Sequence, residues 1–219
     1  MGHIVGLVHA VIPAIEPLKA AFGQLAPDVK LINILDEGLV TEIDRRGSLT
    51  PGLVRRLTTL ITLAEEAGAE LVLLSCTAYS PVADDAQKQS DIPVLKIDEL
   101  MVRDALSRGK RIGLVATVPA GLNMQRQLIG QIAAEMGSDI ELDAVLKPEA
   151  FQALSNGRRE EHDAIVLAEV ERLAQSNDLV MLAQASMGHL ASKVPPSVTV
   201  PVLSSPVLAV HKVKEMLGA

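Results

Sequence analysis

Leu71-Val72-Leu73-Leu74-Ser75-Cys76-Thr77-Ala78-Tyr79-Ser80 is a run of four apolar residues that leads into a small polar turn. Continuous apolar strands are typical of parallel sheets, which helices cover on both faces. The turn contains the only cysteine and the only tyrosine of the protein. Open α/β sheets bind their ligands at the carboxyl ends of the strands, so this turn is the first candidate for a functional site.

Further strands and helices alternate on both sides of this stretch. The helix before it is expected to begin at Thr50, a capping residue followed by Pro51, and to end at Gly68. Alternation at this spacing indicates βαβ units, and therefore an α/β protein whose sheets are mostly parallel and flanked by helices. Apolar runs predict the other strands at residues 3–10, 29–35, 93–97, 111–117, 140–145, 178–183 and 200–203.

The two halves of the sequence repeat each other. Gly6–Val8 returns as Gly113–Val115 after 107 residues, and Pro93–Leu95 returns as Pro201–Leu203 after 108. The sequence therefore predicts two pseudo-symmetric α/β halves, 1–106 and 107–219, each of a usual domain size. The last helix could cross back onto the first half. Duplicated halves of this kind are expected to direct their strand ends into one cleft.

The offset of 108 places Gln184 opposite Cys76, and Ala185–Ser186 opposite Thr77–Ala78. Each turn offers backbone N–H groups and a hydroxyl at the start of a following helix, an arrangement that binds anions. Helix N-termini also stabilise a thiolate, so Cys76 could take and give a proton. The alternative is that Cys76 is a buried packing residue. The pair of turns predicts a site for a small carboxylate that needs no metal.

Composition excludes several classes of protein. With a net charge of -7, no basic tract and 1% aromatic residues, the chain is not expected to bind nucleic acid. One cysteine excludes an internal disulfide framework and fits a reducing cytoplasm. The apolar run Ile4–Ile15 lacks a basic leader and is too short to span a membrane, so it is expected to be a core strand. Glycine-rich nucleotide motifs are absent from the sequence, which disfavours a nucleotide cofactor.

Several other polar residues could either contact a ligand or have a purely structural role. His9 ends the first strand and could contact a ligand or be a hydrogen-bonded core histidine. Thr117 is expected at the equivalent strand end of the second half, as a ligand contact or a helix cap. Tyr79 could bind a carboxylate or fill a gap. Asp36 and Glu37 end a strand and could orient a lid.

A polar group at Glu160–Asp163 could suggest a metal site. At a helix N-terminus such residues are more often a solvated cluster favoured by the helix dipole, so no metal is expected. Met181, Met187 and His189 are interpreted as packing residues.

The motifs, taken in order, resemble those of the aspartate/glutamate racemase superfamily. That group includes amino-acid and hydantoin racemases, maleate isomerases and arylmalonate decarboxylases. The resemblance covers nearly the whole chain and is carried by GLVH (6–9), DEGL (36–39), LLSCTAYSP (73–81), PVLKIDELM (93–101), RIGLVAT (111–117), LAQASMGHL (182–190) and PVLSSP (201–206).

The resemblance implies two Rossmann-like halves with the active site between them and no cofactor. Racemases of this group carry one cysteine in each half, on opposite faces of the substrate carbon. Cys76 matches the first, whereas Gln184 stands at the second position, with Ser186 two residues later. Glutamine cannot transfer a proton, and an unassisted serine is a poor acid or base. A two-cysteine racemase is therefore not available.

Three functions remain open under this resemblance. The first is a cofactor-independent racemase or isomerase that acts on a small carboxylic acid through Cys76. The second is a single-cysteine decarboxylase of the arylmalonate type, and the third is a non-catalytic carboxylate-binding protein. A homodimer is expected from the family. The predicted substrate-binding residues are His9, Thr77, Ala78, Tyr79, Thr117, Gln184, Ala185 and Ser186.

Overall fold

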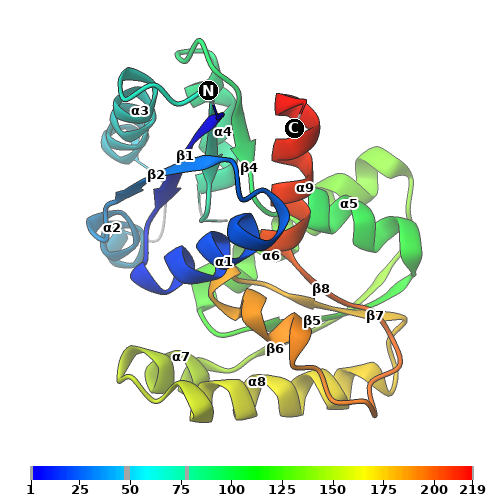
Figure 1. The fold of residues 1–219 in the computed structure, drawn as a ribbon. Helices are drawn as coiled ribbons and strands as arrows, with labels where there is room; N and C mark the ends of the chain where they lie inside the picture. The colour runs from blue at the N-terminus through cyan, green and yellow to red at the C-terminus, as the bar shows by residue number, and fades with distance from the viewer. Residues whose placement is uncertain (1, 47–49, 77–78, 219) are drawn as a thin grey trace. The chain divides into compact units, whose positions relative to one another are not determined.

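The computed structural model describes residues 2–46, 50–76 and 79–218 (Figure 1). Its strands form two four-stranded sheets in which every neighbouring pair is parallel. The predicted α/β class is therefore confirmed. The first sheet has the order β2-β1-β3-β4, built from Lys30–Leu35, Ile4–His9, Leu71–Leu74 and Val94–Lys96. The second has the order β6-β5-β7-β8, built from Glu141–Leu146, Arg111–Ala116, Leu179–Leu182 and Val202–Ser204.

The chain forms two compact units. One comprises Met1–Ile97 with Pro206–Ala219, and the other Asp98–Ser205. The helices of the first are α1 (Ile15–Leu25), α2 (Gly38–Arg46), α3 (Pro51–Glu66), α4 (Ser80–Gln87) and nearly all of α9 (Ser205–Leu217), with the 3-10 turn η1 (Ile12–Ala14). Those of the second are α5 (Glu99–Arg108), α6 (Pro119–Met136), α7 (Pro148–Ser155), α8 (Arg159–Ala174) and the 3-10 helix η3 (Ala185–Ser192).

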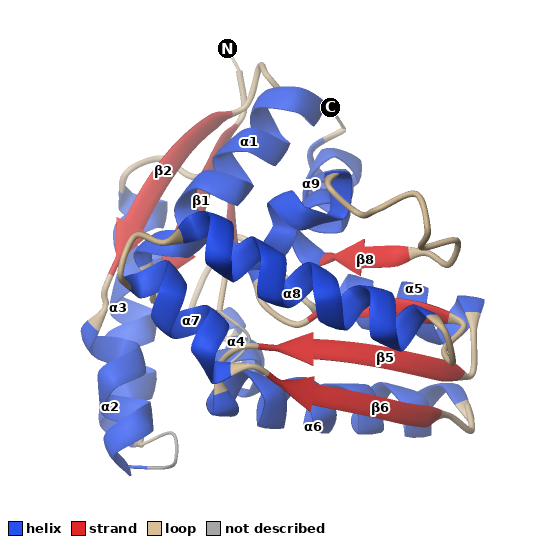
Figure 2. Ribbon diagram, turned by 90° about the horizontal axis from the view of Figure 1, so that it is seen from below, coloured by secondary structure: helices blue, strands red, loops and turns tan. Residues whose placement is uncertain are grey.

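Helix α3 of the first unit and helix α8 of the second cover the same two strands of their sheets, the central strand and the one after it in the sheet order. In the second unit α8 packs on β5 and β7, while α6 packs on β5 and β6 and α5 on β7 and β8 (Figure 2). In the first unit α3 packs on β1, β2 and β3. The helix that follows the last strand of each sequence half packs in the other compact unit, since α5 follows β4 and α9 follows β8. The repeats 1–106 and 107–219 and the compact units are thus different divisions of the chain.

Helix α3 begins and ends as its sequence predicts. The Thr50 side chain accepts a hydrogen bond from the backbone N–H of Leu53 at 3.3 Å, and Pro51 occupies the first turn. After the helix, Gly68 has φ +92°, a conformation that side chains other than glycine rarely adopt. The helix therefore stops in time for the chain to turn back into β3.

The glycine of each repeated Gly-Leu-Val motif lets a helix approach its central strand. A Cβ added at Gly6 in β1 would lie 2.7 Å from the Cβ of Ala64 in α3. A Cβ added at Gly113 in β5 would lie 3.0 Å from the Cβ of Leu173 in α8. The sequence repeat therefore preserves a close helix–strand contact.

A carboxylate at the start of the third strand of each unit binds the backbone where the central strand begins. Glu70 accepts the N–H of Ile4 at 3.1 Å. Asp178 accepts the N–H groups of Lys110 and Arg111, each at 2.9 Å. The backbone N–H and the guanidinium of Arg111 lower the pKa of Asp178 to about 2. The repeat thus extends to a polar contact that the sequence comparison did not include.

Helices α2 and α7 are not predicted by the sequence analysis. Both follow the edge strand of their sheet, β2 or β6. Asp36 accepts the N–H of Gly38 at 3.0 Å at the start of α2, and Pro148 occupies the first turn of α7. Proline in a first turn is a helix-start signal that could have identified α7. Among the described helices, none has the length and apolar character needed to cross a bilayer.

Candidate functional site

Cys76 lies directly after β3, at the carboxyl end of a fully buried strand. The residue is half-buried, and its carbonyl oxygen accepts the N–H of Tyr79 at 3.1 Å. The predicted ligand contacts Thr77 and Ala78 lie outside the described residues. The strand therefore places Cys76 where the sequence analysis expects it, at the strand end of a parallel sheet.

A narrow apolar pocket, too tight to admit a water molecule, adjoins Cys76 within the first unit. His9 and Tyr79, two of the predicted site residues, also line it. Tyr79 is only 2% exposed, so most of its ring is core. The remaining lining is apolar and consists of Val8, Ala10, Leu39, Leu57 and Leu74. The first unit thus brings Cys76, His9 and Tyr79 to one pocket.

His9 is fully buried and bonded at both ring nitrogens. Its Nε2 lies 3.0 Å from the Asn33 side-chain oxygen, and its Nδ1 lies 2.9 Å from Ser75 Oγ. A carbonyl oxygen only accepts, so Nε2 carries the hydrogen and Nδ1 of a neutral ring accepts the Ser75 hydroxyl. The Val8 carbonyl oxygen lies 3.1 Å from the same hydroxyl, so the single Ser75 hydrogen is shared between this oxygen and Nδ1.

Burial lowers the pKa of His9 below its ordinary 6.5, and the hydrogen bond to Asn33 only partly offsets this effect. His9 is therefore neutral at pH 7. Because Ser75 precedes Cys76, the His9–Ser75 bond holds the strand end that carries the thiol. His9 is therefore a hydrogen-bonded core histidine, one of the two roles expected for it. Its ring also lines the pocket.

Gln184 follows β7 and its amide has a defined orientation. Its Oε1 accepts the backbone N–H of Thr117 at 3.1 Å and the Thr117 hydroxyl at 3.2 Å. Two donors at one end identify it as the oxygen, so the NH₂ group points the other way. Nε2 is buried, and no described residue accepts from it. A Cβ added at Gly121 would lie 2.5 Å from Nε2, so any other residue there would force the amide to shift.

Strand register corrects the expected equivalence of Thr117. Leu74 lies opposite Val8 in the first sheet, and Leu182 lies opposite Val115 in the second. The first strands of the two halves are therefore 107 residues apart, one fewer than the strands that lead to Cys76 and Gln184. Thr117 is equivalent to Ala10, and His9 is equivalent to Ala116, so the second unit has no histidine at that strand end.

Ala185 and Ser186 begin η3, which is a 3-10 helix rather than the α-helix that an anion site would favour. Ala185 is buried and Ser186 is half-buried. The Ser186 carbonyl oxygen accepts from His189 Nδ1 at 3.2 Å. His189, expected to be a packing residue, instead holds this turn by a hydrogen bond.

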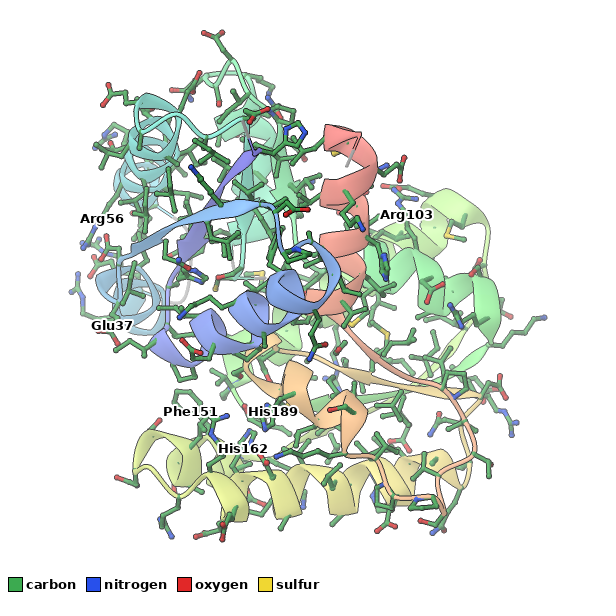
Figure 3. The ribbon with its side chains drawn as sticks, viewed as in Figure 1. Glu37, Arg56, Arg103, Phe151, His162 and His189 are labelled. Carbon is green, nitrogen blue, oxygen red and sulfur yellow. The ribbon has the colours of Figure 1, made fainter. Side chains whose placement is uncertain are left out.

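The polar residues Glu160–Asp163 on α8 also differ in burial from what the sequence predicts. Glu160 and Glu161 are exposed as predicted, but His162 is fully buried and Asp163 is 8% exposed. Asp163 Oδ1 accepts from His162 Nδ1 at 2.9 Å and from His189 Nε2 at 2.8 Å. The solvated-cluster prediction is therefore wrong for His162 and Asp163, because His162 lies beside His189 of η3 (Figure 3) and Asp163 bonds to it.

Asp163 is ionised in this setting. Burial raises its pKa, but hydrogen bonds from Lys193, His162 and His189 outweigh that effect and lower the pKa to about 2. The Lys193 ammonium lies 2.9 Å from Oδ2. Burial lowers the pKa of His162, whose hydrogen bond to Asp163 acts in the opposite direction.

Asp36 has a structural partner, in contrast to the lid role considered for it. It caps α2 and forms an ion pair with the guanidinium of Arg56 in α3. Glu37 is exposed (Figure 3). The pair therefore joins α2 to α3 beside the end of β2.

Sequence reasoning missed several polar partners in both units. Ser75 and Asn33 bind His9, and Lys193 binds Asp163. Ser75 directly precedes Cys76 and could have been noticed on that ground. Asn33 comes from a neighbouring strand and Lys193 from beyond η3, so no local pattern connects them to their partners.

Comparison with known proteins gives one consistent group. A profile described as Asp/Glu/hydantoin racemase matches residues 7–213. A glutamate racemase from Picosynechococcus sp. is 29% identical over 116 residues, which is 52% of this chain and 40% of that protein. The chain thus spans well under half the length of that curated relative.

Solved structures show the same fold. An aspartate racemase from Picrophilus torridus has a TM-score of 0.75 at 14% identity, covering 99% of this chain and 95% of its own. An allantoin racemase from Klebsiella pneumoniae has a TM-score of 0.72 at 17% identity, covering 99% and 88%. The duplicated α/β architecture is therefore that of solved racemase structures.

Proposed function

The chain belongs to the Asp/Glu/hydantoin racemase family, and from that premise we propose that it is a cofactor-independent enzyme that moves a proton at the α-carbon of a small carboxylic acid. Cys76 is the proposed acid and base. The observation that carries the proposal is the position of this thiol at the carboxyl end of β3, where parallel sheets place reacting groups.

The surroundings of Cys76 support proton transfer. The narrow pocket beside it is lined mainly by apolar side chains, which keep water away from that side of the residue. His9 is neutral and held by Ser75 and Asn33, so it supplies a fixed polar edge to that pocket. Tyr79, Thr77 and Ala78 stay among the proposed substrate-binding residues of the first half.

Gln184 limits the reaction that the second half can assist. An amide cannot exchange protons with a substrate, but its NH₂ group donates hydrogen bonds. Thr117 holds the oxygen end, so the two N–H donors remain for an acceptor such as a carboxylate or carbonyl oxygen. We propose Gln184, Thr117, Ala185 and Ser186 as substrate-binding rather than proton-transferring residues.

This orientation of Gln184 favours one second candidate, a decarboxylase. Loss of CO₂ from a malonate-type acid leaves an enediolate, which a single thiol can protonate from one face. A racemase needs a proton donor on each face, so it would require a second base other than Gln184. Decarboxylation is therefore the runner-up, within the same family and at the same cysteine.

Proton exchange in D₂O tests the proposal. The purified chain is incubated with a panel of small α-substituted carboxylic acids, including 2-amino, 2-hydroxy and 2-arylmalonic acids, and the α-protons are followed by NMR. We expect deuterium to enter the α-carbon of at least one acid. Scrambled configuration identifies a racemase, retained configuration identifies one-sided exchange, and release of CO₂ identifies a decarboxylase.

Tight binding of an acid without exchange or product would contradict the enzyme and support a carboxylate-binding protein. Absence of exchange across the whole panel at high enzyme concentration would also count against the proposal. Cys76→Ala serves as the matched control, since any exchange that it retains does not depend on the thiol.

A further inference from the structure

His162, Asp163 and His189 form a cluster in the second unit that the proposed reaction does not use. His162 and Asp163 lie in the first turns of α8, and His189 lies on η3. One ligand atom from each residue lies within 4.8 Å of the other two. The rings of His162 and His189 are stacked with their centroids 6.2 Å apart (Figure 3). Two imidazoles and a carboxylate are a common ligand set for zinc.

Both ring nitrogens of His189 face oxygen atoms, so a neutral ring, with one hydrogen, can donate to only one of them. Nδ1 lies 3.2 Å from the Ser186 carbonyl oxygen, and Nε2 lies 2.8 Å from Asp163 Oδ1. Both oxygens only accept, whereas a neutral imidazole has one hydrogen to donate. Either a second proton or a metal ion at Nε2 satisfies this arrangement. Donation of Nδ1–H to a backbone carbonyl is the usual support of a histidine that binds a metal through Nε2.

The distances suit a small ion after a modest adjustment. The Asp163 oxygen lies 2.9 Å from His162 Nδ1 and 2.8 Å from His189 Nε2. Ligand atoms around zinc, with bonds of about 2.1 Å, stand roughly 3.4 Å apart, so each pair must open by about 0.5 Å. His162 is fully buried, which shields the cluster from water.

Lys193 bears on the affinity of such a site. Its ammonium lies 2.9 Å from Asp163 Oδ2, the oxygen that faces away from the two rings. That bond orients the carboxylate, and the positive charge opposes a cation. The Lys193 side chain is 52% exposed, so solvent screens much of this repulsion.

We propose that His162 Nδ1, Asp163 Oδ1 and His189 Nε2 bind one divalent transition-metal ion of the zinc type. Three protein ligands leave a fourth position for water. The ion would join α8 to η3, the turn that carries Ser186, and so stabilise the second unit. The site does not include Cys76, and its test measures zinc binding without using the proposed reaction.

Zinc binding by the chelator-treated full chain tests the proposal, with competition against a chromophoric chelator at pH 7.5 as the measurement. We expect one zinc ion per chain with micromolar or tighter affinity. His189→Gln is expected to weaken binding by at least about 100-fold. His211→Gln is the matched control, because His211 is exposed on α9 and outside the cluster. Its affinity should equal that of the wild type.

Lys193→Gln supplies a second variant at a largely exposed position. Loss of its charge should tighten zinc binding by about tenfold. Zinc at 100 times its Kd should also raise the Tm of the wild type by about 5 °C, and that of Lys193→Gln at the same free zinc by more. Less than half an ion bound per chain at micromolar free zinc would overturn the proposal. So would wild-type affinity in a folded His189→Gln variant, or an unchanged Tm with zinc.

Discussion

His9 makes the stability of the first unit depend on pH. The unfolded chain takes up a proton at His9 below its ordinary pKa of 6.5, whereas the buried ring resists protonation until a lower pH. Between those two values the unfolded state binds more protons, so the free energy of unfolding falls as the pH falls. The lowered pKa of His162 acts in the same direction.

We therefore expect urea unfolding of the wild type to show lower stability at pH 5.5 than at pH 7.5, by at most about 1.4 kcal/mol per pH unit for each histidine. His9→Gln keeps a polar side chain that does not titrate, so its stability should vary less over this range. His211→Gln, at an exposed position, should vary as the wild type does. An equal pH dependence in His9→Gln and the wild type would contradict this account of His9.

At the scale of elements, the repeated glycines set the distance between helix and strand. Gly6→Ala places a methyl group against Ala64 in α3 and should destabilise the protein by about 1–3 kcal/mol. Gly23→Ala is the matched control, because Gly23 is exposed in α1 and an added Cβ meets nothing within 4 Å. That change should raise stability by about 0.5–1 kcal/mol. Denaturant unfolding measures both, and equal stability of Gly6→Ala and the wild type would contradict the close contact.

The start of α3 depends on one side chain in the same way. Thr50→Ala removes the acceptor of the Leu53 N–H and should cost about 1 kcal/mol. Thr59 lies on the exposed face of the same helix, where its hydroxyl donates to the Arg55 carbonyl oxygen. Thr59→Ala should be neutral or slightly stabilising, because alanine is the better helix former. Equal free energies of unfolding for Thr50→Ala and Thr59→Ala would contradict a stabilising role of the Thr50 cap.

At the scale of the whole molecule, the repeat made most of the fold predictable from sequence. Continuous apolar strands and the repeated Gly-Leu-Val and Pro-Val-Leu motifs indicated parallel sheets, because each pattern reflects a local requirement of the strand or its covering helix. Helix α2 was not predicted, because the sequence after Asp36 is typical of a turn. The Asp36 carboxylate that caps the helix also follows directly on the strand. The partner of His9 was misplaced by one residue because the offset of 108 was applied to the first strands, whose own offset is 107.

The candidate site was less predictable than the fold. Cys76 and Gln184 were found because each follows an apolar strand at equivalent places in the repeat. The contacts that orient them were not, since Ser75–His9 and Thr117–Gln184 each join strands that are 66 or 67 residues apart. The burial of His162 and Asp163 depends on which face of α8 meets η3, and the acidic sequence at the helix start gives no sign of it.

The central claim is that the thiol of Cys76 moves a proton of a small carboxylic acid. The measurement is the rate of α-deuterium incorporation, or of CO₂ release, for the acid that the panel identifies, in the wild type and in Cys76→Ser. Ser90→Ala, a change near the surface of the same unit, is the control. We predict that Cys76→Ser retains the wild-type Tm within a few degrees and loses about 10²–10⁴-fold in rate, because a hydroxyl is a far weaker acid–base than a thiol. A folded Cys76→Ser variant with a rate within twofold of the wild type would contradict the claim.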